Sequence, residues 1–136
     1  MRFPGIVVGD RITVGKTVSE EDAAGNFWTT DFEKLLSTPA LAAYMIEASS
    51  KLLEHKLPDG FISVGKSSEI VHEHPSVVGA HVTVKVEIKA FDGYHIVLQM
   101  TANDESGIIA RGTHVRSIVN QRWMTLKVSK RVASLK

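Results

Sequence analysis

No cysteine occurs among the 136 residues of the chain. Disulfide frameworks, zinc sites built on thiolates and cysteine nucleophiles are therefore excluded, and the stability of the fold has to come from packing. Long apolar runs are lacking as well. No segment approaches the length of a membrane span, and the apolar run near residue 6 is too short for the central region of a signal peptide. We therefore expect a cytoplasmic protein that makes no contact with a membrane.

The motifs that define the commoner enzyme classes are also absent. The sequence has no Gly-x-Ser-x-Gly elbow, phosphate-binding loop, dinucleotide fingerprint or paired-histidine zinc helix, so no cofactor is expected. Aromatic residues make up only 7% of the chain, and the predicted strands do not interleave them with basic residues as a nucleic-acid surface requires. A plain nucleic-acid binder is therefore not expected.

Composition and charge indicate one domain with a distinctive end. Hydrophobic residues make up 43% and charged residues 23% of the chain, as in ordinary globular domains, and no repeat or linker divides it. We expect a single domain over residues 1–120, with residues 121–136 as a basic tail of the same domain. Such a tail either binds a phosphate-bearing ligand or nucleic acid, or is a solvated and partly frayed terminus, and its charge alone does not decide between these. Its cations, with no acid among them, are Arg122, Lys127, Lys130, Arg131 and Lys136.

One long helix is predicted after residue 37. Thr38 suits the N-cap, and Pro39 suits the first helical position, where its missing N–H costs nothing. Apolar residues then recur at three- and four-residue steps until about His55. The face that they form is predicted to lie in the core: Leu41, Ala42, Met45, Ile46, Ser49, Leu52 and Leu53.

The other elements are predicted to be strands. Apolar and polar residues alternate most strictly over residues 82–89, and Asp92-Gly93 supplies a tight turn into a strand that places Tyr94 and Ile96 on one face. Strands are predicted over residues 11–18, 61–74, 82–89, 94–102 and 108–120. One long apolar helix between a first strand and a run of antiparallel strands indicates an α+β hot-dog fold, a curved antiparallel sheet wrapped around one central helix. A cone-shaped sheet needs several N-terminal helices, and the sequence predicts only one long helix.

Glu47 is the first candidate for chemistry. It lies almost opposite the centre of the apolar stripe, on a face that also carries the small residues Ala40, Ala43 and Ser50. One interpretation is a solvated glutamate paired with Lys51 one turn on. The other is a carboxylate in a recess that a substrate or a second chain covers, where the loss of water raises its pKa toward that of a useful base.

His72 is the second candidate. In a regular strand it shares its face with Ile62, Val64 and Ile70, so we expect it to point inward. An inward histidine is either a catalyst or a hydrogen-bonded core residue. His74 shares this face and raises the possibility of a metal, but no third ligand is evident from spacing and no metal site is expected.

Two further residues allow both functional and structural interpretations. Gly65 lies inside a predicted strand, where glycine marks a bulge or the close approach of another group to the backbone, and its N–H suits a carbonyl oxygen. Arg116 shares a strand face with His114, where it either holds a phosphate or forms a surface ion pair. Local sequence leaves these alternatives open.

Taken together, these segments resemble a known family. Residues 37–47, 65–72 and 112–116, within a likeness over roughly three quarters of the chain, are similar to the fluoroacetyl-CoA thioesterase family of hot-dog proteins. The most specific part is the seven-residue spacing of Gly65, His72 and Gly79. The resemblance implies an enzyme that hydrolyses the thioester bond of a small acyl-CoA, and leaves the acyl group itself open.

The resemblance also implies roles for individual residues. Glu47 falls on the family's catalytic glutamate, His72 on its catalytic histidine and Gly65 on the glycine whose N–H meets the thioester carbonyl. Thr38 lies one residue from the position of the catalytic threonine, and Phe32 corresponds to the aromatic gate before the helix. As a hypothesis, Arg116 and the basic tail hold the phosphates of coenzyme A.

Two alternative functions and a homodimer are also consistent with a hot-dog fold. A non-catalytic acyl-CoA-binding or regulatory hot-dog module keeps the cleft and the basic tail but needs no pair such as Glu47 and His72. A hot-dog dehydratase needs an aspartate-to-histidine segment that the sequence lacks. We expect a homodimer with its sites at the interface, because a sheet around one helix leaves strand edges unpaired and the small-residue face of the helix needs a covering partner.

Overall fold

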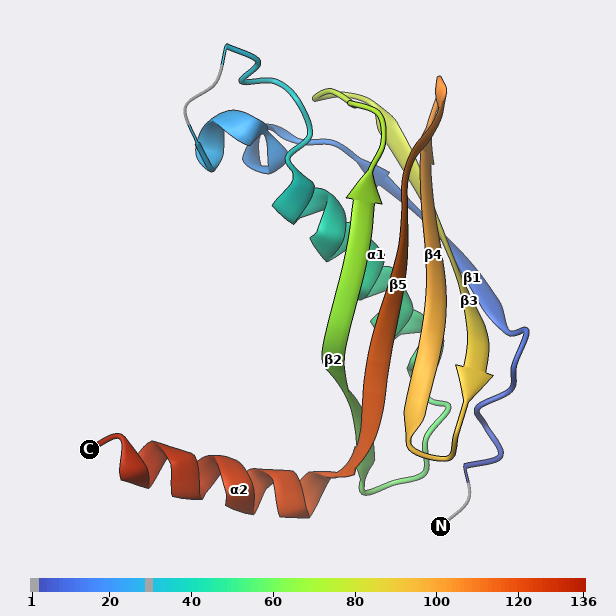
Figure 1. Ribbon diagram of the computed structural model, residues 1–136, viewed down its shortest axis with the longest axis vertical. Coiled ribbons are helices and arrows are strands. Elements are labelled where there is room, and N and C mark those ends of the chain that lie inside the picture. Colours follow the sequence, from blue (N-terminus) through green and yellow to red (C-terminus); the bar gives the residue numbers. More distant parts are fainter. Residues whose placement is uncertain (1–2, 29–30) are drawn as a thin grey trace.

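The protein folds as one antiparallel sheet with a long helix packed against it, as predicted for a hot-dog domain (Figure 1). The computed structural model describes residues 3–28 and 31–136. The strand order is β1-β3-β4-β5-β2, so β1 and β2 are the edges of the sheet. The elements are β1 (Arg11–Thr17), the 3-10 turns η1 (Glu20–Asp22) and η2 (Ala24–Asn26), α1 (Thr38–Leu53), β2 (Phe61–His72), β3 (His81–Phe91), β4 (His95–Asp104), β5 (Gly107–Asn120) and α2 (Gln121–Ser134).

The cap of α1 differs from the prediction by one residue. Ser37, only 1% exposed, is the N-cap, and its Oγ accepts the N–H of Ala40 at 3.1 Å. Thr38 is instead the first residue of the helix, followed by Pro39. Serine and threonine are both good N-caps, which is why sequence alone chose between them wrongly. The hydroxyl of Thr38 is left available for another partner.

The core lies between α1 and the inner face of the sheet. Leu41, Met45 and Leu52 are buried as predicted. Ala40, which we expected on the outer face, is only 8% exposed and belongs to the core. The outer face of α1 therefore carries fewer small residues than predicted, with Ala43 and Ser50 remaining exposed.

The central strands follow their predicted alternation. The inner residues of β3 and β4 are fully buried: Val82, Val84, Val86, Ile88, Ile96, Leu98 and Met100. Tyr94 does not share this face. It lies in the turn before β4 and is 62% exposed, because the strand begins one residue later than predicted.

A bulge in β2 changes which of its residues face inward. Gly65 pairs with Arg116 and Ser67 with Val115, so Lys66 is an extra residue without an opposite partner. The extra residue reverses the alternation along the strand. Opposite residues of antiparallel strands share a face, and Gly65 and Ser68 therefore both lie on the inner side. The prediction that His72 shares a face with Ile62 and Val64 was wrong for this reason, although the inward orientation of His72 was right.

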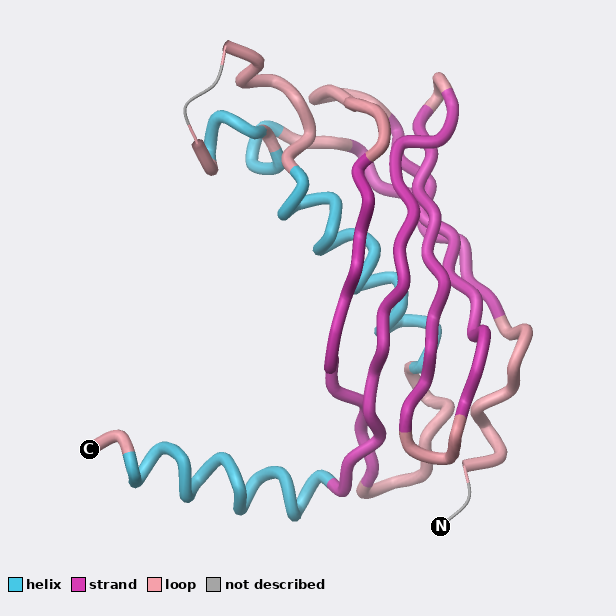
Figure 2. The backbone as a smooth tube through the Cα atoms, in the orientation of Figure 1, coloured by secondary structure: helices cyan, strands magenta, loops and turns pink. Residues whose placement is uncertain are grey.

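The C-terminal residues form a helix instead of a frayed end. In Figures 1 and 2, α2 leaves the end of β5 and extends past the edge strand β2, away from the sheet. Its N-cap is Asn120, whose side chain accepts the N–H of Trp123, and none of its residues is buried. No helix in the described part of the chain is long and apolar enough to cross a membrane.

Gly112 is required by the close pairing of β2 with β5. A Cβ at this position would lie 2.7 Å from the carbonyl oxygen of Glu69, and backbone cannot move aside as a flexible side chain can. We predict that Gly112→Ala lowers the free energy of unfolding by about 1–3 kcal/mol, the usual cost of overpacking. The control is Gly15→Ala in β1, where an added Cβ meets nothing within 4 Å. Urea unfolding checks this, and equal effects at both glycines would contradict it.

Candidate active site

Thr38 and His72 meet at one end of the molecule. The first residue of α1 and the last residue of β2 come together, and Thr38 Oγ1 lies 2.9 Å from His72 Nδ1. The contact is possible because Ser37 caps the helix and leaves the threonine hydroxyl available. These two residues were both predicted to belong to the site, and they are the pair that one chain brings together.

The surroundings of the other nitrogen of His72 determine the protonation of the ring. Nε2 is buried and has no hydrogen-bond partner among the described residues. Burial disfavours the charged imidazolium and lowers the pKa of His72, although the nearby backbone of His74 acts in the other direction. The ring is therefore neutral near pH 7 and able to accept a proton.

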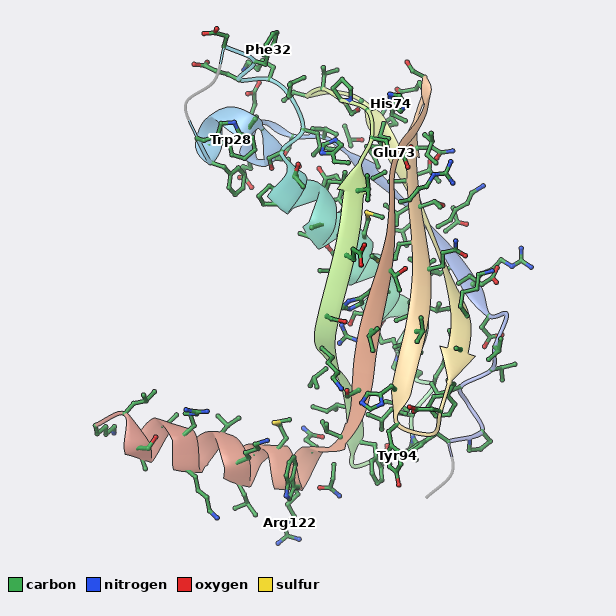
Figure 3. The ribbon with its side chains drawn as sticks, viewed as in Figure 1. Trp28, Phe32, Glu73, His74, Tyr94 and Arg122 are labelled. Atoms are coloured by element: carbon green, nitrogen blue, oxygen red, sulfur yellow. The ribbon has the colours of Figure 1, made fainter. Side chains whose placement is uncertain are left out.

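A pocket of about 280 Å³ opens beside this pair. Leu35, Leu36 and Trp28 make its wall largely apolar, as suits a small acyl group. In Figure 3, Trp28 lies at the same end of the molecule as Glu73 and His74. The complete lining is Ala24, Trp28, Leu35, Leu36, Thr38, His72, Glu73, His74 and Pro75.

The aromatic residue of the pocket is not the predicted one. Phe32, expected as a gate, is 67% exposed and is not part of the pocket lining, whereas Trp28 is. Trp28 was not among the predicted site residues, because the segment around it does not follow the pattern of the family. The signal that would have found it is a tryptophan in the loop before the helix that carries Thr38.

Glu47 lies away from His72 within one chain. Its carboxylate is 3.7 Å from the ammonium of Lys16 on β1, the edge of the sheet opposite to β2. The predicted structural partner, Lys51, is therefore replaced by Lys16. The side chain of Glu47 is 51% exposed, so such an ion pair contributes little to stability. Glu47 can therefore act in catalysis only if a second chain places His72 or a substrate beside it.

A buried polar cluster lies beneath Gly65. A Cβ on this glycine would be 3.4 Å from the ring of His114 and 3.9 Å from the guanidinium of Arg116. Arg116 Nη1 donates to His114 Nε2 at 3.2 Å, so the ring proton is on Nδ1, from which it is donated to the carbonyl of Ser67 at 2.9 Å. Burial, with a smaller contribution from Arg116, lowers the pKa of His114 and keeps it neutral.

Arg116 is a buried cation without a carboxylate partner in the described part of the chain. Its guanidinium also donates to the hydroxyl and the carbonyl of Ser63, both at 2.9 Å, and the residue is only 8% exposed. The surface ion pair, one of the two interpretations from sequence, does not fit this buried position. The positive charge is directed instead to the inner side of β2, beside Gly65.

No group of three or more His, Asp or Glu side chains suited to a metal ion occurs within residues 3–28 and 31–136.

Comparison with known proteins shows which family the chain is similar to. Residues 18–122 match the family model described as fluoroacetyl-CoA-specific thioesterase. The fluoroacetyl-CoA thioesterase of Streptantibioticus cattleyicolor is 23% identical over 129 residues, covering 91% of this chain and 93% of that protein. A hot-dog-like protein from Thermanaerovibrio acidaminovorans is 34% identical, with a TM-score of 0.87 and 93% coverage of both chains. A thioesterase superfamily member from Thermus thermophilus shares the fold at 18% identity and a TM-score of 0.82, over 95% of this chain and 97% of that one.

The family model spans most of the chain, including the Thr38–His72 pair and the strand with Gly65. The chain therefore belongs to the fluoroacetyl-CoA-specific thioesterase family and is a hot-dog-fold acyl-CoA thioesterase.

Proposed function

We propose that the protein hydrolyses the thioester of a small acyl-CoA at the Thr38–His72 pair. The observation that carries the proposal is their 2.9 Å hydrogen bond at the mouth of a mostly apolar pocket of about 280 Å³. The relative from Streptantibioticus cattleyicolor is named for fluoroacetyl-CoA. The apolar wall of Trp28, Leu35 and Leu36 supports a hydrocarbon acyl group here.

His72 acts as the general base and acid in this proposal. The neutral ring takes a proton from the attacking water, or from Thr38 if its hydroxyl is the nucleophile, and returns it to the leaving thiolate. The buried Nε2 supports this role because it has no partner among the described residues. Thr38 on Nδ1 fixes the orientation of the ring.

The glycine assigned to the thioester carbonyl has to come from a second copy. Seven residues of extended strand separate Gly65 from His72 by about 23 Å, so one carbonyl cannot meet both in the same chain. We infer that two copies pair their β2 edges around a two-fold axis near Ser68 and Glu69. Antiparallel pairing then places Gly65 of one copy opposite His72 of the other, about 5 Å away between Cα atoms.

This arrangement gives the buried polar cluster a function. Gly65 and Arg116 of one copy stabilise the oxyanion that forms at the site of His72 in the other copy. The positive charge of Arg116 is effective there because no carboxylate among the described residues neutralises it. Glu47 likewise contributes to the site that contains His72 of the other copy, and not to a site within its own chain. It lies on the outer face of α1 with Ala43 and Ser50, whose small side chains leave room for a second chain.

Helix α2 supplies the phosphate-binding charge in this proposal. Its start lies beside Phe61, because Asn120 pairs with that residue, and the two-fold axis places this end of β2 next to the His72 end of the second copy. The cations of α2 then face the mouth of the partner's pocket, where the phosphates of coenzyme A emerge. Arg122 is shown in Figure 3 at the start of this helix.

A non-catalytic acyl-CoA-binding module is the alternative. It predicts tight binding of acyl-CoA with no release of thiol from any of a panel of acyl-CoAs. The orientation of His72 by Thr38 favours catalysis, because a binding module does not need a positioned base.

We predict that His72→Asn lowers kcat about 100- to 10,000-fold, the range of general acid–base catalysis. The chain offers a matched control in His81, whose Nδ1 lies 3.0 Å from the hydroxyl of Thr17 outside the pocket. His81→Asn should leave kcat unchanged. Thiol release measures both, and equal losses in the two variants would remove His72 from the chemistry.

The pH profile tests the state of the same ring. Burial lowers the pKa of His72 below its ordinary 6.5, so the neutral base persists as the pH falls. We predict that the acid limb of kcat/KM lies below pH 6.5 and disappears in His72→Asn. An acid limb at a higher pH would contradict the assignment of that limb to His72.

Mixing inactive variants tests whether the site is shared. Glu47→Gln and His72→Asn should each be inactive, but a mixed dimer combines Glu47 of one chain with His72 of the other. We predict that co-refolding equal amounts restores about a quarter of the parental activity, because half of the dimers are mixed and each has one intact site. No recovery, or a monomer in sedimentation, would overturn the shared site.

The charge of α2 has its own test. We predict that changing Arg122, Lys127 and Arg131 to Gln raises KM about tenfold with kcat nearly unchanged, since these side chains bind a part of the substrate far from the reacting carbon. Added salt should raise KM of the parent and have less effect on this variant. An unchanged KM would remove α2 from the site.

A further inference from the structure

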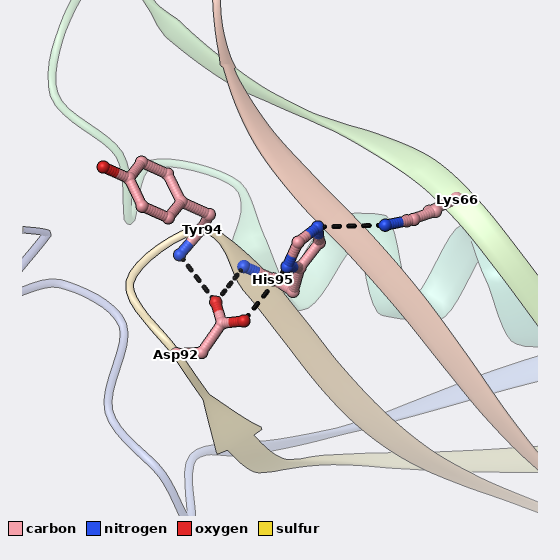
Figure 4. Close-up of polar contacts among 4 residues, drawn as sticks. All are labelled: Lys66, Asp92, Tyr94 and His95. Atoms are coloured by element: carbon pink, nitrogen blue, oxygen red, sulfur yellow. Dashed lines mark hydrogen bonds and ion pairs between the residues drawn. The ribbon is translucent and has the colours of Figure 1, made fainter.

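Three polar side chains form a chain of contacts outside the proposed site. Lys66 Nζ lies 3.1 Å from His95 Nε2, and His95 Nδ1 lies 3.0 Å from a carboxylate oxygen of Asp92 (Figure 4). The other oxygen of Asp92 accepts the backbone N–H groups of Tyr94 at 2.9 Å and His95 at 2.6 Å. The order carboxylate, imidazole, amine is that of a nucleophile next to an oriented base.

The β2 bulge aims the lysine at this histidine. Lys66 is the extra residue between Gly65 and Ser67, and its side chain crosses β5 to reach the first residue of β4. Bulges commonly redirect a side chain in this way. The side chain of His95 is 39% exposed and that of Asp92 62% exposed. A solute molecule can therefore reach Lys66, which is itself exposed.

The hydrogen bonds fix where the protons lie. The backbone N–H groups of His95 and Tyr94 hold the pKa of Asp92 well below its usual range, so it is a carboxylate and only accepts. The proton of His95 is then on Nδ1, and Nε2 presents a lone pair to the ammonium of Lys66. The imidazole can take a proton from Lys66, and Asp92 stabilises the imidazolium that results.

We propose that Lys66 is a site of acylation by acyl-CoA thioesters. His95 removes a proton from the ammonium, and the free amine attacks the thioester carbonyl. The carbon–nitrogen bond forms and the carbon–sulfur bond breaks. The amine loses its second proton to solvent, and the thiolate of coenzyme A takes the proton held by His95. The products are an amide on Lys66 and free coenzyme A. This inference goes beyond the proposed hydrolysis and does not depend on Thr38 or His72.

The structural explanations account for only part of the cluster. Asp92 caps the turn before β4 through the two backbone N–H groups, and an exposed lysine keeps the surface of the sheet solvated. Neither role requires the imidazole to bridge the carboxylate and the amine. The consequence of that bridge is that Lys66 reacts faster than other exposed lysines.

Peptide mass spectrometry after incubation of the intact chain with acetyl-CoA tests this proposal, because it gives the acetylation rate of each lysine separately. The reference is Lys130 of α2, which is exposed and has no hydrogen bond to a histidine among the described residues. Hydrolysis of the donor lowers the supply of acetyl-CoA to both lysines alike, and any coenzyme A held by α2 favours Lys130, so a faster reaction at Lys66 is not an effect of binding at α2. We expect acetylation at Lys66 to be about tenfold faster than at Lys130. This is less than the acceleration that a buried general base usually gives, because His95 is partly exposed to solvent.

Two variants separate the imidazole from the general reactivity of the lysine. His95→Gln should reduce acetylation at Lys66 to the rate at Lys130, and Asp92→Asn, which keeps an acceptor for the turn, should reduce it partly. The rate at Lys130 should change in neither. Equal rates at Lys66 and Lys130 in the parent, or an unchanged Lys66 rate in His95→Gln, would overturn the proposal. If His72→Asn abolishes hydrolysis but Lys66 is still acetylated preferentially, the acylation proposal is supported. The tests of hydrolysis and of acylation are therefore independent.

Discussion

The hydrogen bond between Thr38 and His72 is the point on which the rest of the site depends. It joins the start of α1 to the end of an edge strand, two residues that are 34 positions apart in sequence. Capping by Ser37 makes it possible, and the sheet positions its second partner. Because the pair lies at the border of helix and sheet, a pocket opens beside it without a hole in the core.

The edge position of β2 shapes the assembly and the chemistry together. A strand with a free edge is a liability unless another chain or a cover protects it. In this protein the same strand carries His72 and Gly65, too far apart to serve one substrate in a single chain. Pairing of two edges would solve both problems at once, and the extension of α2 past β2 agrees with a neighbour on that side (Figure 1).

Sequence predicted the fold well because most of its signals are local. Strict alternation in β3 and β4 and the apolar stripe of α1 determine which faces are buried, and both appear in the structure. The errors arose where a choice depends on tertiary contacts. Ser37 and Thr38 are equivalent as caps by type, and only the position of His72 separates their roles. The burial of Arg116 and the lining role of Trp28 depend on neighbours from distant segments.

The bulge at Lys66 has a consequence for how this segment can change in evolution. Gly65 and His72 lie an odd number of residues apart, yet both face inward, because one extra residue between them restores the phase of the strand. Losing a single residue outside the bulge would turn His72 toward solvent while the strand itself still paired with β5, whereas losing the extra residue itself would leave a regular strand in which both residues still face inward. Relatives with a working site should therefore combine an odd spacing with a bulge or an even spacing with a regular strand, whereas the lengths of the loops at either end of β2 are not constrained in this way.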